Sequence, residues 1–315
     1  MKKASAYLYL IFAIALATAC KSAKIPVEFV QGDDKIDVLF GGDLFTSYMY
    51  STELTKPILY PIHSPTGIVM NRGFPFVEVE GESKDHPHHT GVFFTVDEVN
   101  GNAFWNTATP PPQIVNVEVT EQKGGAGEGT LAAILHWNGV SGKTLLEENR
   151  TMVFIPGSEV NIIDFTMTLT AKEKVVIKDT KEGMFAIRTA HWLRERGGTG
   201  KYLSSNGDEG AKNVWAKRAK WVALQGDKDG HQVGIAIFNH PESFNYPTYW
   251  HARDYGLFSA NPLGQAVFQK ARGEEPTPID LTLEPGDSRL FKFRMLIYEG
   301  HKTQEQLEQL YLQYE

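Results

Sequence analysis

The residues with the clearest chemical potential are three histidines that fall within four positions. They belong to the segment Asp85-His86-Pro87-His88-His89-Thr90-Gly91. Imidazole and carboxylate groups at this spacing can act as metal ligands, as general bases or as hydrogen-bond partners for hydroxyl groups. Pro87 disfavours a central strand, so we expect a loop or strand end, where binding residues tend to concentrate. A histidine-rich surface turn is the alternative.

A second polar stretch, residues 97–105, follows this segment closely. From the two together we predict His88, His89 and Asp97 as catalytic residues and His86, Asn100 and Trp105 as substrate contacts. His86 and His88 could also hold a divalent metal, but a mononuclear site would need a further ligand that nothing nearby identifies. No cofactor is therefore predicted, and a metal site stays as an alternative.

Another group of histidines and aromatic residues lies at Phe238-Asn239-His240-Pro241 and across residues 245–256. Flat aromatic faces stack on the C–H surfaces of sugars, while histidine, arginine and aspartate form hydrogen bonds with hydroxyl groups. We predict a catalytic role for one residue of this group, His251. The predicted substrate contacts are His240, Trp250, Arg253 and Asp254. The alternative is a well-packed loop whose polar groups are satisfied within the protein.

Arg188 ends an apolar run that begins at Met184, so its guanidinium should emerge at a sheet edge and contact the substrate. His191 follows closely and is a further catalytic candidate. Residues 194–196 (Arg-Glu-Arg) are more typical of a solvated run of charges. The sequence contains neither a nucleophile elbow nor a phosphate-binding glycine loop between a strand and a helix, which argues against nucleotide and flavin cofactors.

The elements that must position these residues are mostly strands. Residues 114–119, 160–169 and 279–283 alternate between apolar and polar side chains, which predicts strands with one face in a core and the other in water. Turn sequences such as Pro156-Gly157-Ser158 separate the runs. This pattern predicts an all-β protein, a large antiparallel β-sandwich.

A single helix is predicted, at the C-terminal end of the chain. Thr303 and Gln306 have capping-box spacing, and Leu307, Leu310 and Tyr311 share one face. This short helix should pack on the outside of a sheet. With no internal repeat and no long linker, residues 35–315 are expected to form one β-sandwich domain.

The first residues are typical of an export signal. A basic start at Lys2 and Lys3 precedes the apolar run from Tyr7 to Ala17, which predicts a signal peptide over residues 1–19. Cys20, the sole cysteine, would be lipidated, and residues 20–34 would form a tether. The expected location is the cell envelope, on the periplasmic side of the outer membrane, with the lipid as the membrane contact. A formal net charge of −7 argues against nucleic acid as a partner.

Several separated motifs carry a resemblance to a known family. These are residues 85–89, 99–101, 104–105, 237–241, 250–256 and 260–264. In this order they resemble the PmoA-like family of exported bacterial proteins, from about Leu44 to Tyr298. The family label derives from a methane oxygenase subunit and so implies a metal-dependent oxygenase. The resemblance also implies a place among carbohydrate-processing proteins, with a sandwich similar to the galactose-mutarotase type.

Mutarotase-like proteins use histidine and carboxylate groups on a sugar held by an open sheet. The resemblance implies His88 or His89 as general acid, with His191, His240 and His251 as further candidates. The base would be Asp97, Glu98 or Asp254.

Three hypotheses follow from the sequence. The leading one is an enzyme that acts on a carbohydrate by histidine and carboxylate acid–base chemistry, through hydrolysis, elimination or epimerisation. The second is a glycan-binding lipoprotein without catalysis. The third is a metal-dependent oxygenase, which would need at least three converging ligands. The first hypothesis predicts a site where a histidine and a carboxylate meet, and the second predicts an aromatic platform on an open face.

Overall fold

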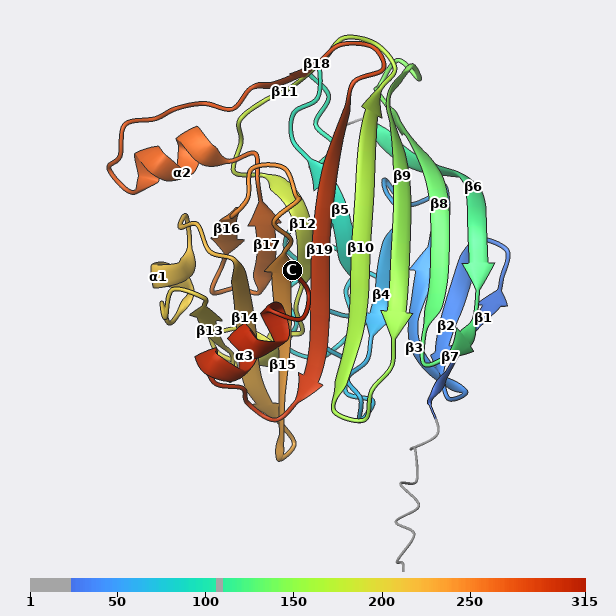
Figure 1. Ribbon diagram of the computed structural model, residues 1–315, viewed down its shortest axis with the longest axis vertical. Helices are drawn as coiled ribbons and strands as arrows, with labels where there is room; N and C mark the ends of the chain where they lie inside the picture. The colour runs from blue at the N-terminus through green and yellow to red at the C-terminus, as the bar shows by residue number, and fades with distance from the viewer. Residues whose placement is uncertain (1–23, 106–109) are drawn as a thin grey trace, which may run out of the picture.

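Two antiparallel sheets packed face to face form the frame of the protein. The computed structural model describes residues 24–105 and 110–315. In Figure 1, β8, β9 and β10 of one sheet lie in front of β2, β3 and β4 of the other. The prediction of an antiparallel β-sandwich with a short C-terminal helix is confirmed. The predicted signal peptide and Cys20 lie outside the described residues.

The nine-stranded sheet carries most of the candidate residues. Its strands are, in spatial order, β16 (Tyr249–Ala252), β17 (Leu257–Asn261), β12 (Gly183–Arg188), β5 (Val92–Val96), β4 (Ile58–Ile62), β3 (Asp43–Met49), β2 (Lys35–Phe40), β1 (Pro26–Gln31) and β7 (Gly125–Ala126).

The eight-stranded sheet faces it across the core. Its order is β13 (Lys201–Ser204), β14 (Trp221–Lys228), β15 (His231–Asn239), β19 (Ser288–Glu299), β10 (Val160–Ala171), β9 (Thr144–Ile155), β8 (Gly129–Asn138) and β6 (Gln113–Lys123). A small pair, β11 (Val175–Ile177) and β18 (Leu281–Leu283), closes one end.

The alternation seen in the sequence matches the burial of the long strands. Along β8 and β10, buried residues alternate with half-buried ones, so that one face of each strand enters the core. The main apolar cluster draws side chains from both sheets, from Val27 near one end of the chain to Ile297 near the other.

Four neighbouring strands of the nine-stranded sheet are buried on both faces. Every residue of β5, β12, β16 and β17 is buried. On β5, Phe94 belongs to the core between the sheets, whereas Phe93 packs on the opposite face in a second cluster with Tyr60 and Trp105. Leu54 and Phe76, from segments that cross this face, pack against the same cluster. A layer of loops therefore covers the outer face here.

The predicted C-terminal helix is α3 (Gln304–Tyr311), and its capping box between Thr303 and Gln306 is present. Leu307 and Tyr311 are buried against the outer face of the eight-stranded sheet, beside β14 and β15 (Figure 1). None of the helices among the described residues is long and apolar enough to cross a membrane.

Three short helical segments were not predicted. They are η1 (His191–Leu193), α1 (Ala211–Val214) and α2 (Gln265–Ala271). The N-cap residue of α2 is Gly264, which has no side chain to bond the first amides. Instead the carboxylate of Asp179 accepts hydrogen bonds from the amides of Ala266 and Val267. A cap supplied from so far away leaves no local signal in the sequence.

Candidate functional site

The histidine segment crosses the outer face of the nine-stranded sheet between β4 and β5. It enters β5 through Gly91, whose φ is +58°. A Cβ atom built at this position would lie 2.4 Å from the carbonyl oxygen of Leu59, so the close approach to β4 requires glycine. The carbonyl of Gly91 also accepts a hydrogen bond from the amide of Arg188 on β12. The histidines are thereby fixed to the sheet at their C-terminal end.

The buried guanidinium of Arg72 fixes the rest of the segment. It donates to four backbone carbonyls, those of Ser83, Asp85, His86 and His89, at 2.7–3.1 Å. Each of these carbonyls would otherwise need a partner from solvent or a neighbouring strand. Arg72 therefore gives residues 83–89 one shape, and the sequence analysis did not identify it.

Three rings form a stack in this segment. The rings of His86 and His89 lie 5.0 Å apart and nearly parallel, and the ring of Tyr255 lies on the other side of His86 at 5.4 Å. The ring of His88 meets that of His89 edge-on at 4.4 Å. Tyr255 precedes β17, so the stack joins two parts of the chain that are distant in sequence.

Asp85 and Arg188 connect this stack to β12. The guanidinium of Arg188 donates to Asp85 Oδ1 at 2.8 Å and lies over the ring of Tyr255, with Cζ 4.7 Å from its centroid. The other carboxylate oxygen, Asp85 Oδ2, lies 2.7 Å from Nδ1 of His86. Burial alone would raise the pKa of Asp85, but hydrogen bonds from Ser83 and the charge of Arg188 hold it at about 2. Asp85 is therefore ionised throughout the neutral range.

Two nitrogen atoms at this site are buried without a hydrogen-bond partner among the described residues. They are Nε2 of His89 and Nε1 of Trp105, whose rings lie 5.4 Å apart. Arg188 Nη1 contacts Nδ1 of His89 at 3.5 Å, and a guanidinium can only donate. Nδ1 is then the acceptor, so Nε2 carries the proton. Both unused atoms are N–H donors, and leaving such donors unpaired is costly unless a ligand uses them.

Lys56 adds a buried ammonium group. Its side chain is 2% exposed, its Nζ donates to the carbonyl of His88 at 3.0 Å, and it lies over the ring of Phe93. No ion pair to Lys56 is found in the described part of the chain. Burial lowers the pKa of Lys56 to about 8. Nothing in its local sequence, Thr55-Lys56-Pro57, distinguished it from a surface lysine.

His88 and His89 are neutral at pH 7. Burial and the charge of Lys56 lower the pKa of His88 to about 4, and burial lowers the pKa of His89 further. A neutral imidazole can accept a proton or donate one N–H, but it does not act as a fixed cation. Of the predicted residues, the structure thus brings together His86, His88, His89, Trp105 and Arg188. We call these residues, with Lys56, Arg72, Asp85 and Tyr255, the histidine cluster.

Arg253 and Asp254 lie beside this cluster. The guanidinium of Arg253 is 5.4 Å from the centroid of the Tyr255 ring. Both residues line a hollow of about 560 Å³, together with Glu195, Ala211, Lys212, Trp215 and Ala252.

Three other candidates have their own surroundings in the described part of the chain. His251 on β16 is buried, and its Nδ1 is 2.7 Å from the carbonyl of Lys181. Asp97 follows β5, and burial with the charges of Glu98 and Glu182 raises its pKa. His191 lies 3.6 Å from a carboxylate oxygen of Glu82.

Three predicted substrate contacts have other positions. Trp250 is fully buried in the core between the sheets, and its Nε1 donates to the carbonyl of Ala219. His240 packs edge-on against Tyr314 near the end of the chain. Asn100 holds a turn by accepting from the amide of Val176. Trp250 thus has a packing position, His240 contacts an aromatic ring, and Asn100 forms a turn, while their predicted contacts with a substrate stay predictions.

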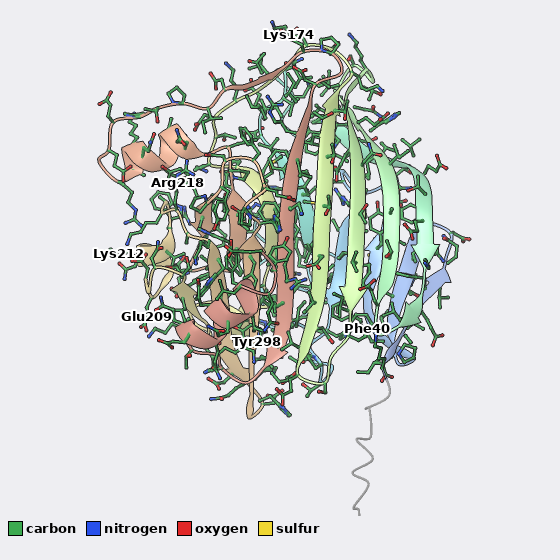
Figure 2. The ribbon with its side chains drawn as sticks, viewed as in Figure 1. Phe40, Lys174, Glu209, Lys212, Arg218 and Tyr298 are labelled. Carbon is green, nitrogen blue, oxygen red and sulfur yellow. The ribbon has the colours of Figure 1, made fainter. Side chains whose placement is uncertain are left out.

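A larger hollow lies elsewhere. It has a volume of about 770 Å³, and its walls include Phe40, Leu44, His63 and Asn161. Phe40 and Lys212, which mark the two hollows, lie on opposite sides of the view in Figure 2. His63 is the one histidine in that wall, and its Nδ1 lies against the carbonyl of Phe45. The smaller hollow and the histidine cluster contain more of the charged and titratable side chains, so they are the better candidate for the functional site.

Among residues 24–105 and 110–315, no group of three histidine, cysteine or acidic side chains could hold a metal ion. The pair His86 and His88 gains no third ligand there. The oxygenase hypothesis therefore has no ligand set in the described part of the chain.

A family model described as a family of unknown function, DUF6807, matches residues 35–312. This finding corrects the resemblance to the PmoA-like family, which nothing supports. No curated protein matches the chain.

Similar solved structures include the α-galactosidase AgaA from Geobacillus stearothermophilus, at 11% identity and a TM-score of 0.43. The match covers 90% of this chain but only 42% of the α-galactosidase. A galactose mutarotase-like protein from Lactobacillus casei is 9% identical, with a TM-score of 0.41 and coverage of 86% and 100%. Galactose 1-epimerase from Lactobacillus acidophilus is 9% identical, with a TM-score of 0.37 and coverage of 89% and 100%. At these scores the similarities assign no activity to the chain.

Proposed function

Because this chain belongs to the DUF6807 family, whose function is unknown, we propose its function from the geometry of the histidine cluster. It is a carbohydrate-active enzyme that moves a proton on a sugar by acid–base chemistry. The site is the outer face of β5 and β12, where the loop layer covers the sheet.

One observation carries this proposal: a neutral histidine lies beside two buried, unused N–H donors. His88 can take a proton from a substrate carbon or hydroxyl at neutral pH. Nε2 of His89 and Nε1 of Trp105 can donate to a substrate oxygen next to that position. The ammonium of Lys56 adds positive charge where negative charge would develop on the oxygen.

This donor-rich arrangement favours elimination or epimerisation over hydrolysis. In elimination from a uronate or keto-glycoside, and in epimerisation at the carbon beside its carbonyl-type group, the base removes the proton on that carbon and negative charge develops on the neighbouring oxygen. In elimination the C–O bond at the next carbon then breaks, and the leaving oxygen takes a proton from the protonated base or from water. In epimerisation the proton returns to the opposite face of the carbon. Hydrolysis of a glycoside generally needs one carboxylic acid that is protonated and a second carboxylate. Asp85, the carboxylate in contact with His86, has a pKa of about 2 and so cannot serve as the acid.

The second candidate, a glycan-binding protein without catalysis, is favoured by a different observation. Arg253 lies between the rings of Trp215 and Tyr255 at the wall of the hollow, in the manner of a binding platform. The two candidates differ in whether His88 is needed for a chemical change.

The test uses soluble protein from Lys21 onward, incubated in D2O with glycosides, keto-glycosides and uronic-acid oligosaccharides. Proton NMR should show an alkene signal or exchange of a C–H proton that is lost in His88→Ala. His136→Ala is the matched control, because His136 lies on β8, half-buried beside Glu147. Line broadening without chemical change would favour the binding protein. An unchanged reaction in His88→Ala would overturn the assigned role.

We also propose export and lipid anchoring, on the strength of the run Tyr7–Ala17 and Cys20 alone. Labelled palmitate should be incorporated into the full chain and not into a Cys20→Ser variant. Equal labelling of the two would overturn this proposal.

A further inference from the structure

We propose that the hollow beside the histidine cluster binds the carboxylate of an acidic sugar, and that Arg253 is its receptor. The inference rests on the proposed function and names the substrate class: a glycan that contains a uronic acid.

The backbone of Arg253 is fixed. Its amide donates to the carbonyl of Leu257 at 2.8 Å, and its carbonyl accepts from the amide of Gly256 at 3.0 Å. The tight turn that follows depends on Gly256, whose φ is +96° and whose Cβ, if present, would lie 2.8 Å from Thr189 Oγ1. The root of the Arg253 side chain is thus held against the sheet.

The guanidinium of Arg253 lies between two aromatic rings and has no anionic partner. Its Cζ is 5.9 Å from the centroid of Trp215 and 5.4 Å from that of Tyr255. Within the described residues it takes part in no hydrogen bond or ion pair, whereas Arg72 and Arg188 are each bonded to several acceptors. Stacking on rings leaves the planar fork of N–H donors free at its edge, which suits a carboxylate held by two hydrogen bonds.

Neither acidic residue of the hollow forms an ion pair with Arg253. Both carboxylate oxygens of Glu195 already accept backbone hydrogen bonds, from the amides of Tyr202 and Ala211 at 2.9 and 2.8 Å. The carboxylate of Asp254 lies 3.9 Å from Arg196. Lys212, exposed at the rim, brings a second cation to the same hollow.

Trp215 supplies a further donor. Its Nε1 is buried and has no hydrogen-bond partner among the described residues, and the ring lines the hollow beside Arg253. A ring at this wall can stack on the C–H groups of a sugar, which fits a sugar better than a free inorganic anion.

Tyr255 connects the hollow to the histidine cluster through Arg253, which lines the hollow. The ring of Tyr255 contacts Arg253 and also stacks on His86 and lies under Arg188. A sugar whose carboxylate reaches Arg253 would therefore place its neighbouring atoms toward the histidines. In this arrangement Arg253 positions the substrate while His88 performs the proton transfer.

The experiment compares binding of paired probes by calorimetry. Each pair consists of a uronic-acid oligosaccharide (galacturonate, glucuronate or mannuronate) and its methyl ester, used with the soluble chain from Lys21 onward. At least one acid should bind about tenfold more tightly than its ester, since hydrogen bonds between charged groups are the strong ones. Arg253→Gln should remove this preference while the weak binding of the ester is unchanged, and Arg253→Lys should keep part of it.

Two further variants separate a specific role from a loss of structure. Trp215→Phe keeps a smaller aromatic ring and removes the N–H, and should weaken binding of the acid several-fold. Arg289→Gln is the matched control, because Arg289 lies on β19 and donates to the carbonyl of Ser288. All variants should show the thermal unfolding midpoint of the unsubstituted protein within a few degrees.

The outcomes distinguish this inference from the proposed function. Preferential acid binding that depends on Arg253, without any reaction, would support the carboxylate site and overturn the enzyme. A reaction that requires His88 but acts equally on acids and esters would support the enzyme and overturn the carboxylate site. Preference for sulfated sugars over uronic acids would also overturn it.

Discussion

The outer faces of the two sheets differ in their exposure to water. On β8 and β10 of the eight-stranded sheet, every second residue is half-buried, so this stretch of the outer face contacts water. On β5 and β12 of the nine-stranded sheet every residue is buried, because loops form a third layer. Titratable groups under that layer lose contact with water, and this desolvation shifts their pKa values toward the neutral form. Unused donors, a buried lysine and neutral histidines are therefore found together on the covered face.

Removing one histidine from each sheet tests whether the covered face has a special role in turnover. His88→Ala, under the covering layer, should lower turnover of the sugar identified by NMR by about 100-fold or more, the usual contribution of a general base. His136→Ala, on β8, should leave turnover within about twofold of the unsubstituted enzyme. Steady-state rates of the two variants decide the matter. Similar losses in both would mean that the covered face has no special role.

A second test compares two arginines for their effect on stability. Arg72→Met removes the donor for four carbonyls of residues 83–89 and should lower the free energy of unfolding by about 3 kcal/mol or more. Arg294→Met breaks a pair with Asp164 on the eight-stranded sheet and should cost about 1 kcal/mol. Urea unfolding at pH 7 measures both. Equal costs would show that the covering layer is not held by Arg72.

Acid should destabilise the covered face. Burial lowers the pKa of His251 to about 4 from 6.5, so the unfolded chain binds the proton more readily between these values. Stability is therefore full above pH 6.5 and falls as the pH drops toward 4, by on the order of 2–3 kcal/mol for this residue. In urea unfolding at pH 7 and pH 4.5, His251→Gln should lose less stability than the unsubstituted protein. An identical loss of stability in the variant and the unsubstituted protein would show that His251 does not cause the acid sensitivity.

The smallest effect is expected on the opposite face. Thr303→Ala removes the side chain that caps α3 and should lower the free energy of unfolding by about 1 kcal/mol. Because α3 packs on the eight-stranded sheet, turnover should not change. Loss of activity in this variant would imply that the two faces are coupled through the core.

Most of the frame was predictable from the sequence because it depends on local patterns. The alternation in residues 160–169 and the capping spacing of Thr303 and Gln306 correspond directly to β10 and α3. The cluster of His86, His88 and His89 was also visible, since three histidines so close together are rare in a structural segment.

The partners of those histidines were not predictable in the same way. Lys56 and Arg72 look like surface residues, and their burial depends on carbonyls of residues 83–89. Trp250 shows the opposite case: its aromatic type suggested a sugar contact, whereas its side chain lies in the core between the sheets. Local sequence reports the type of a side chain, whereas burial is decided by segments that are distant along the chain.

The hydrogen bonds from Arg72 to residues 83–89 affect the free energy of ligand binding. Four hydrogen bonds to one guanidinium fix this segment when the protein folds, so its conformational entropy is lost before any sugar arrives. A ligand then meets a preorganised site and loses little further freedom there. Association with the histidine cluster should accordingly be fast, and its affinity should fall when the contacts of the buried Arg72 side chain are loosened.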